Sequence, residues 1–159
     1  YVALENGQEG YVEDITWRYT TIRMLSNSMV IIPNAKLASA VATNFALPDA
    51  EIAVLVNVGV AYGSDLEKVE SVTTEVARAV MKEVDGGVPG FEPFSRYNKF
   101  DDSSIGFSVI LRGKEFTSQY LLRHELIKRL HKRYRAEGIE IPFPIRTIRM
   151  ERQGPSPNP

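Results

Sequence analysis

The chain has two histidines, His124 and His131, and both lie in the segment RHELIKRLHKRY. The letters HEL resemble the start of H-E-x-x-H, a helical zinc site in which histidines four residues apart bind the metal. Here position 128 is Lys, and on a helix the two imidazoles stand roughly 10 Å apart along the axis. We therefore interpret both histidines as surface residues of a basic helix and predict no metal site.

A second polar cluster, DDSS at residues 101–104, offers oxygen ligands of the kind that calcium prefers. It lacks the glycine and the distal glutamate of a calcium loop, so we interpret it as a hairpin turn. The chain has no Cys, which excludes thiolate catalysis and disulfides. No nucleophile elbow, P-loop or dinucleotide fingerprint occurs. The sequence therefore predicts neither an enzyme nor a cofactor.

The strongest chemical signal is the dense positive charge around the histidines. Residues 112–152 hold 11 Lys or Arg against 5 Asp or Glu, whereas residues 1–111 hold 8 against 15. Such a surface can bind phosphates, be solvated, or face an acidic neighbour. The first predicted helix could supply that neighbour through Glu67, Glu70, Glu75 and Glu83. The cations of the basic helix are Arg123, Lys128, Arg129, Lys132, Arg133 and Arg135.

Phosphate binding would make the chain an RNA-binding module. Residues 51–150 follow the element order of an RNA-recognition domain, and SIGFSVIL at residues 104–111 resembles the strand on which bases stack. That strand needs exposed aromatic rings at alternate positions, but Phe107 is followed by Val109 and Leu111. RNA binding is therefore kept as the alternative function, and no nucleic-acid partner is expected.

Residues 1–48 show the alternation that is typical of strands. In YVEDITWRYTTIRML, residues 11–25, Ile15, Trp17 and Tyr19 fall on one face of a predicted half-buried strand. MVIIPN, residues 29–34, predicts a short buried strand that ends at Pro33, because proline cannot donate to a ladder. Together they predict a small, strongly bent β barrel or sandwich of four or five strands. ALPDAE, residues 46–51, is the predicted linker.

Residues 51–144 predict a second domain. EIAVLVNVGV alternates as a strand, and the helix after it begins with Ser64 and Glu67 as a capping box. FEPFSRYNKF and IGFSVILRG predict a hairpin. The second helix begins at Thr117 or Ser118 and ends at Gly138, and residues 139–150 predict a last strand. The order β-α-β-β-α-β predicts a ferredoxin-like sandwich, a four-stranded antiparallel sheet with two helices on one face. The fold class is thus mixed β and α+β.

The composition is ordinary for a globular protein, with 43% hydrophobic and 25% charged residues and a net charge of −1. This balance argues against a protein that coats nucleic acid. No apolar run reaches the roughly 20 residues of a membrane span, so we expect a soluble chain. Because it begins at Tyr1, we expect it to be a piece of a longer protein.

The segment GYVEDITWRYTTIRMLSNSMVIIPNAKLASAVATNFA, residues 10–46, resembles the middle β domain of the mechanosensitive channel of small conductance (MscS) family. The shared pattern is G-x-V-x-x-I-x-x-R-x-T-x-I followed by N-x-x-V-x-I-P-N. VGVAYGSDLEKV resembles the family's entry into its α/β domain, and EGIEIPFPIRTI resembles its closing strand. The positions that we take as the structural motif of the β domain are Gly10, Val12, Ile32, Pro33, Asn34 and Asn44.

The resemblance implies a small Sm-like β domain over residues 1–48 and the ferredoxin-like domain over residues 51–144. It implies a C-terminal barrel strand at residues 145–152, followed by a disordered tail at residues 153–159. In the family, seven copies assemble into a channel. The β domains form a ring under the pore, and the α/β domains form a hollow cytoplasmic cage with lateral portals.

The transmembrane and pore helices of the family are absent from this sequence. The resemblance therefore implies the cytoplasmic cage of a channel at the inner face of the cell membrane, which releases ions and osmolytes on hypo-osmotic shock. On this interpretation the chain associates with itself and acts as an assembly domain and sieve, not as the gate. The six cations of the basic helix then become candidates for portal or subunit-interface charges.

Overall fold

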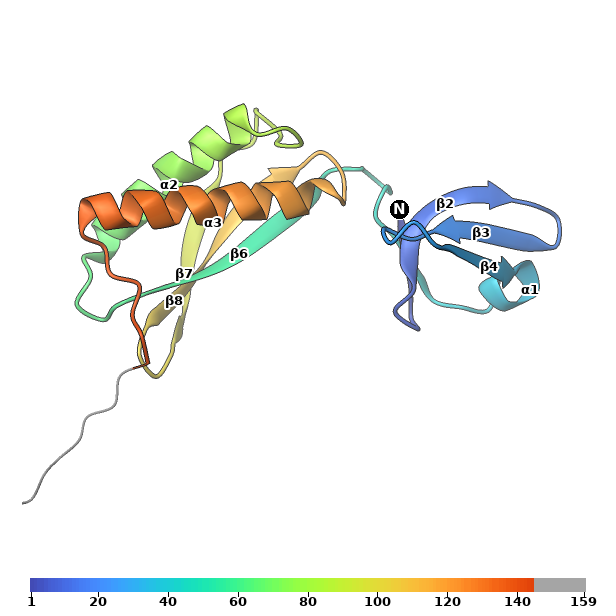
Figure 1. Ribbon diagram of the computed structural model, residues 1–159, viewed down its shortest axis with the longest axis horizontal. Helices are drawn as coiled ribbons and strands as arrows, with labels where there is room; N and C mark the ends of the chain where they lie inside the picture. Colours follow the sequence, from blue (N-terminus) through green and yellow to red (C-terminus); the bar gives the residue numbers. More distant parts are fainter. Residues whose placement is uncertain (145–159) are drawn as a thin grey trace, which may run out of the picture.

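The computed structural model describes residues 1–144, which form two lobes joined by a short linker (Figure 1). The N-terminal lobe is a β domain, and the C-terminal lobe is an α/β domain. The elements of the β domain are β1 (Val2–Leu4), β2 (Glu9–Ile15), β3 (Tyr19–Arg23), β4 (Met29–Pro33), α1 (Asn34–Leu37) and β5 (Ala42–Asn44).

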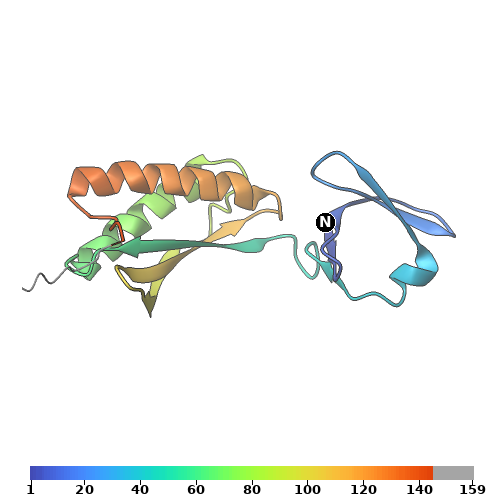
Figure 2. The ribbon, with the colours of Figure 1, turned by 60° about the horizontal axis from the view of Figure 1, so that its bottom comes forward.

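The five strands of the β domain make one antiparallel sheet in the order β4-β3-β2-β1-β5. The sheet curves round on itself without closing, as Figure 2 shows, and a register shift between Val12 and Asp14 marks an irregularity in β2. The core that it encloses is small, because only Leu4, Ile22 and Ile32 are buried hydrophobic residues there. The prediction of a bent β unit of four or five strands is confirmed.

Two details of the predicted strands are wrong. Residues 11–25 form a hairpin, not one strand, because the hydroxyl of Thr16 accepts hydrogen bonds from the amides of Arg18 and Tyr19 and closes a turn. Trp17 lies at that turn and is 85% exposed. The strand β4 is not buried as a whole either, because a single curved sheet covers only one of its two faces. Ile32 points into the core, while Ile31 is 64% exposed.

The α/β domain consists of a three-stranded antiparallel sheet, in the order β6-β8-β7, with two helices on one face (Figure 1). The predicted alternation of the first strand is confirmed, since Val54, Val56 and Val60 are buried against the helices. The elements are β6 (Ile52–Val60), α2 (Leu66–Glu83), β7 (Phe94–Phe100), β8 (Ile105–Gly113) and α3 (Ser118–Glu137).

The helix ends agree only in part with the predictions. Asp65, not Ser64, caps α2, because its carboxylate accepts hydrogen bonds from the amides of Glu67 and Lys68. Thr117 precedes α3, but its hydroxyl makes no capping bond, because its own backbone is helical (φ −72°, ψ −21°) and not extended as in a capping residue. The hydroxyl donates to the side chain of Glu115 instead. Gly138 ends α3 as predicted, in the left-handed conformation with φ of 69° that favours glycine.

The predicted last strand is absent over residues 139–144. Pro142 and Pro144 interrupt this stretch and remove two backbone donors. The amide of Ala61, just after β6, still donates to the carbonyl of Glu140, and the amide of Ile139 donates back to the carbonyl of Tyr134 in α3. Residues 145–152, the predicted barrel strand, and the predicted tail at 153–159 lie outside the described residues. Over residues 1–144 the sheet thus has three strands, not the four predicted.

None of the helices within residues 1–144 is both long enough and apolar enough to cross a membrane.

Candidate functional site

Asn34 is the most highly connected residue of the predicted motif. Its Nδ2 donates a hydrogen bond of 2.7 Å to the carbonyl of Thr16, and its Oδ1 accepts one of 2.8 Å from the hydroxyl of Thr20. Its backbone amide donates to the carbonyl of Arg18 at 2.9 Å. Pro33 ends β4 and places Asn34 at the first residue of α1. Asn34 therefore ties the end of β4 to the β2–β3 turn.

Gly10 and Ile32 belong to the packing of the β domain. Gly10 lies under β3, and a Cβ there would stand 2.3 Å from the carbonyl oxygen of Arg23 and 2.9 Å from Cγ2 of Ile22. No larger residue fits without moving the backbone. Ile32 is only 6% exposed and packs with Leu4 and Ile22.

The other two motif residues lie nearer the surface. Val12 pairs with Ile22 beside the irregularity of β2 and is 40% exposed. Asn44 pairs with Val2 in the outer strand β5, and its Oδ1 accepts from the amide of Ala46. The motif is thus spread over the β domain and does not converge on one ligand site.

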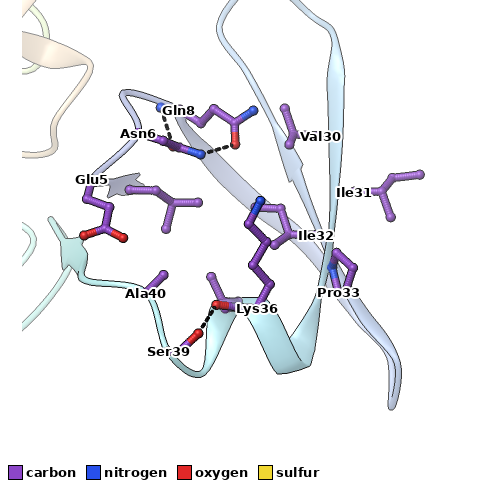
Figure 3. A pocket seen from close by; sticks show the side chains of 12 residues that line it. Glu5, Asn6, Gln8, Val30, Ile31, Ile32, Pro33, Lys36, Ser39 and Ala40 are labelled. Atoms are coloured by element: carbon purple, nitrogen blue, oxygen red, sulfur yellow. Dashed lines mark hydrogen bonds between the residues drawn. The ribbon is translucent and has the colours of Figure 1, made fainter.

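A hollow of about 410 Å³ opens on the concave side of the curved sheet (Figure 3). Ile32 points into it, whereas Ile31 points away from it. Glu5 and Lys36 line it, and Asn6 donates to the side chain of Gln8 nearby. These groups include no nucleophile with an adjacent base, so the hollow lacks the parts of a catalytic site.

The basic helix α3 faces the acidic helix α2, as the third interpretation of its charge predicts. The guanidinium of Arg129 lies 2.6 Å from Glu83 of α2 and also contacts Glu125. Arg133 lies 3.0 Å from both Glu75 of α2 and its own helix neighbour Glu137. A row of ion pairs, here called the α2–α3 seam, therefore joins the two helices.

The seam changes the acidity of its carboxylates. The hydrogen bond from Lys128 lowers the pKa of Glu125, and those from Arg133 and Lys68 lower the pKa of Glu137. The two carboxylates therefore stay ionised to lower pH than free glutamates do.

The six predicted cations differ in their contacts. Arg123 donates to the carbonyl of Leu55 in β6, and Lys128 pairs with Glu125 on its own helix. Lys132 and Arg135 have exposed side chains, and no ion pair is recorded for either within residues 1–144. Lys132 and Arg135 are thus exposed charges without an ion pair in the described part of the chain, and Arg123 contacts only a neutral carbonyl. Lys132 also lines a hollow between the two helices with Val76 and Ala79.

The surface that RNA recognition would need is buried. Phe107, Val109 and Leu111 of β8 are each at most 1% exposed, because they face the helices. The free face of the same strand carries Ser108, which donates to Asn57 and accepts from Asn98. The central strand β8 therefore exposes no aromatic ring on which a nucleotide base could stack.

The two domains meet at a cluster of aromatic rings that sequence reasoning missed. Tyr1 stacks on Phe116 with ring centroids 4.3 Å apart, and Phe45 lies 4.4 Å from the same ring. The hydroxyls of Tyr11 and Thr117 share a hydrogen bond of 3.1 Å across the junction. Burial raises the pKa of Tyr1 to about 12. Side chains from both domains thus form one contact, which only their aromatic character could have hinted at.

Within residues 1–144, no group of three or more acidic, Cys or His residues could hold a metal ion. The contacts described above are the hydrogen bonds of Asn34, the close packing of Gly10, the α2–α3 seam and the aromatic junction. Each of these holds parts of a protein together. The geometry therefore defines a two-domain structural module, in which a curved β sheet contacts an α/β domain through aromatic rings.

Comparison with known families agrees with this class. The family described as "Mechanosensitive ion channel, beta-domain" matches residues 2–47, and "Mechanosensitive ion channel MscS, C-terminal" matches residues 54–141. The chain therefore belongs to the MscS family of mechanosensitive ion channels.

Individual relatives give the same result. The small-conductance mechanosensitive channel MscMJ of Methanocaldococcus jannaschii is 28% identical over 92% of this chain and 41% of its own length. The small-conductance channel of Helicobacter pylori is 29% identical over 95% of this chain and 53% of its own length. The crystal structure of H. pylori MscS in the closed state superposes with a TM-score of 0.76 at 26% identity, over 96% of this chain and 58% of that one.

Arabidopsis thaliana MSL1 shares the fold, with a TM-score of 0.62 at 14% identity over 89% of this chain and 52% of that one. The relatives from M. jannaschii and H. pylori are both small-conductance mechanosensitive channels. The chain spans about half the length of the relatives it matches.

Proposed function

We propose that this chain is the cytoplasmic cage portion of a mechanosensitive channel that releases ions and osmolytes on hypo-osmotic shock. Copies of the chain assemble into a homoheptamer at the cytoplasmic face of the membrane, and the chain acts as assembly domain and sieve, not as the gate. The finer fold description belongs to this proposal: an Sm-like β domain and a ferredoxin-like domain.

The observation that carries the proposal is the open sheet of the β domain. Over the described residues, β4 and β5 each pair on one side only, and they stand at opposite ends of the sheet order. Unpaired strand edges invite a further strand. Because the two edges differ, pairing β4 of one copy with β5 of the next is head-to-tail, and head-to-tail contacts form a ring when the rotation between copies closes.

The small core favours the same conclusion. Three buried hydrophobic residues are few for a domain of this size. Ile31 and Met29 on β4 are 64% and 50% exposed. A neighbouring copy against β4 would remove this apolar surface from water, which is favourable by roughly 25 cal/mol for each Å².

The test compares two exposed isoleucines. Ile31→Lys should lower the mass of the assembly measured by light scattering, because it places a charge at the β4 edge. Ile127→Lys changes an isoleucine on α3 that is 53% exposed and should leave the mass unchanged. Equal masses for both variants and the unchanged chain would contradict pairing at β4.

The proposed sieving role depends on two exposed charges of α3, Lys132 and Arg135. Charges select ions only within a Debye length of the path, about 8 to 10 Å at cell salt. In the full-length parent channel, replacing Lys132 and Arg135 together with Gln should shift the reversal potential toward cation preference. The double exchange Lys132→Arg and Arg135→Lys is the control, because it keeps both positive charges on α3. An unchanged reversal potential would exclude α3 as the filter.

A further inference from the structure

We propose that the β2–β3 turn, residues 16–19, is a contact site for the interface of a lipid bilayer. At its apex Trp17 is 85% exposed, and the guanidinium of Arg18 lies over its ring at 4.8 Å from the centroid. Ile15, just before the turn, is 68% exposed. Trp is enriched at the headgroup level of membranes, because its ring is apolar while its indole N–H can bond polar groups. The neighbouring Arg18 can contact the lipid phosphates at the same level.

The backbone on both sides of Trp17 is already hydrogen-bonded within the protein. The carbonyl of Thr16 accepts a hydrogen bond from the side chain of Asn34. The carbonyl of Tyr19 accepts hydrogen bonds from the amide and the hydroxyl of Thr16. The carbonyl of Arg18 accepts from the amide of Asn34, and the amides of Arg18 and Tyr19 donate to the hydroxyl of Thr16. Both main-chain groups of Thr16, Arg18 and Tyr19 are therefore already paired. This matters because an unpaired backbone group is costly in an apolar medium.

The position of the turn keeps it accessible. In both views the β2–β3 turn lies at the end of the β domain that is remote from the α/β domain (Figures 1 and 2). It belongs to neither β4 nor β5, the two edges that the proposed ring would use. The contact thus goes beyond the proposed function and does not require ring formation.

The charge of the turn points to a bilayer and not to a polyanion. Arg18 is the only cation of residues 13–20, and Asp14 lies in the same hairpin. Glu13 is paired with Arg23. Without net positive charge, attraction to phosphates alone is weak, so the apolar ring supplies the binding. The contact should therefore form on zwitterionic lipid and persist in salt.

The experiment uses Trp17, the one tryptophan of the chain, as its own probe. The whole chain is mixed with phosphatidylcholine vesicles up to millimolar lipid, with and without brominated acyl chains, at low and high salt. The expected results are a blue shift of the emission and quenching by brominated lipid, both unchanged by salt. Ile15→Ser should weaken the apparent partition constant by about tenfold, which corresponds to about 1.4 kcal/mol.

A matched control moves the probe to the other domain. In the double variant Trp17→Phe and Phe100→Trp, the tryptophan replaces a side chain that is 81% exposed at the end of β7. That probe should show neither shift nor quenching. No quenching of Trp17, equal quenching of both probes, or loss of binding in salt would each overturn the proposal. A monomeric chain that still shows quenching would contradict only the ring.

Discussion

The side-chain amide of Asn34 donates a hydrogen bond of 2.7 Å to the main-chain carbonyl of Thr16. This bond joins the residue after β4 to the turn between β2 and β3, and the hydroxyl of Thr20 completes the link through Oδ1 of Asn34. One side chain thus determines how the last strand before α1 meets the hairpin. The relationship explains why an asparagine follows Ile-Pro at this point of the chain.

Replacing Asn34 should destabilise the β domain. Asn34→Ala leaves the Thr16 carbonyl and the Thr20 hydroxyl without this partner, which costs about 1–3 kcal/mol for each group that stays buried. Urea unfolding followed by circular dichroism measures the loss. Asn6→Ala is the control, because that side chain makes only exposed hydrogen bonds, both to Gln8. Equal stability of the two variants would mean that the Asn34 bonds do not hold the domain.

Gly10→Ala should also destabilise the β domain, through overpacking. The new Cβ would stand 2.3 Å from the carbonyl oxygen of Arg23, and forcing a methyl group into a filled site costs about 1–3 kcal/mol. Gly63→Ala is the matched control, because a Cβ there meets no atom within 4 Å. The two thermal midpoints, measured side by side, should differ. A Gly10→Ala midpoint equal to that of Gly63→Ala would contradict the close approach.

Phe116→Ala should uncouple the two domains without unfolding either one. Phe116 contacts Tyr1 and Phe45 of the β domain, so its loss removes most of the aromatic contact at the junction. Small-angle scattering should show a broader distribution of intramolecular distances, while the circular dichroism spectrum stays the same. Phe143→Ala removes a ring that is 85% exposed and should leave the scattering unchanged. An unaltered profile for Phe116→Ala would show that the junction does not hold the domains.

The α2–α3 seam predicts a pH-dependent contribution to stability. Hydrogen bonds from Arg133 and Lys68 lower the folded-state pKa of Glu137 below its unfolded value of about 4.3. The resulting stabilisation is complete above that value and is lost as the pH falls through the folded-state pKa. Glu137→Gln should therefore lower the thermal midpoint at pH 7 and have little effect in strong acid. Glu140→Gln is the control, and a Glu137→Gln effect that persists in strong acid would contradict the ion pair.

The sequence predicted the elements better than their contacts. The alternation of residues 52–60 and the glycine at position 138 specify local geometry directly, and both predictions are confirmed. The capping box failed because Ser64 and Asp65 are neighbouring residues that can both cap a helix, and the aspartate does so. The hairpin at residues 16–19 was missed because its turn contains no glycine or proline and continues the alternation of the strands.

Contacts between distant segments could be predicted only where charge made them specific. The acidic face of α2 and the basic face of α3 were possible partners from the sequence, and Glu75 and Glu83 meet Arg133 and Arg129. The junction of Tyr1 with Phe116 has no comparable signal, because apolar rings contact any apolar neighbour. The role of Asn34 needed the structure as well, since its partners lie 18 and 14 positions earlier in the chain.

Ring assembly is best tested by the absolute mass of the purified chain. Light scattering across a range of concentrations measures this mass without reference to shape. A heptameric ring predicts a species of about seven times the 17.8 kDa chain mass that becomes dominant as concentration rises. A mass of 17.8 kDa at every concentration would contradict self-assembly through the β4 and β5 edges.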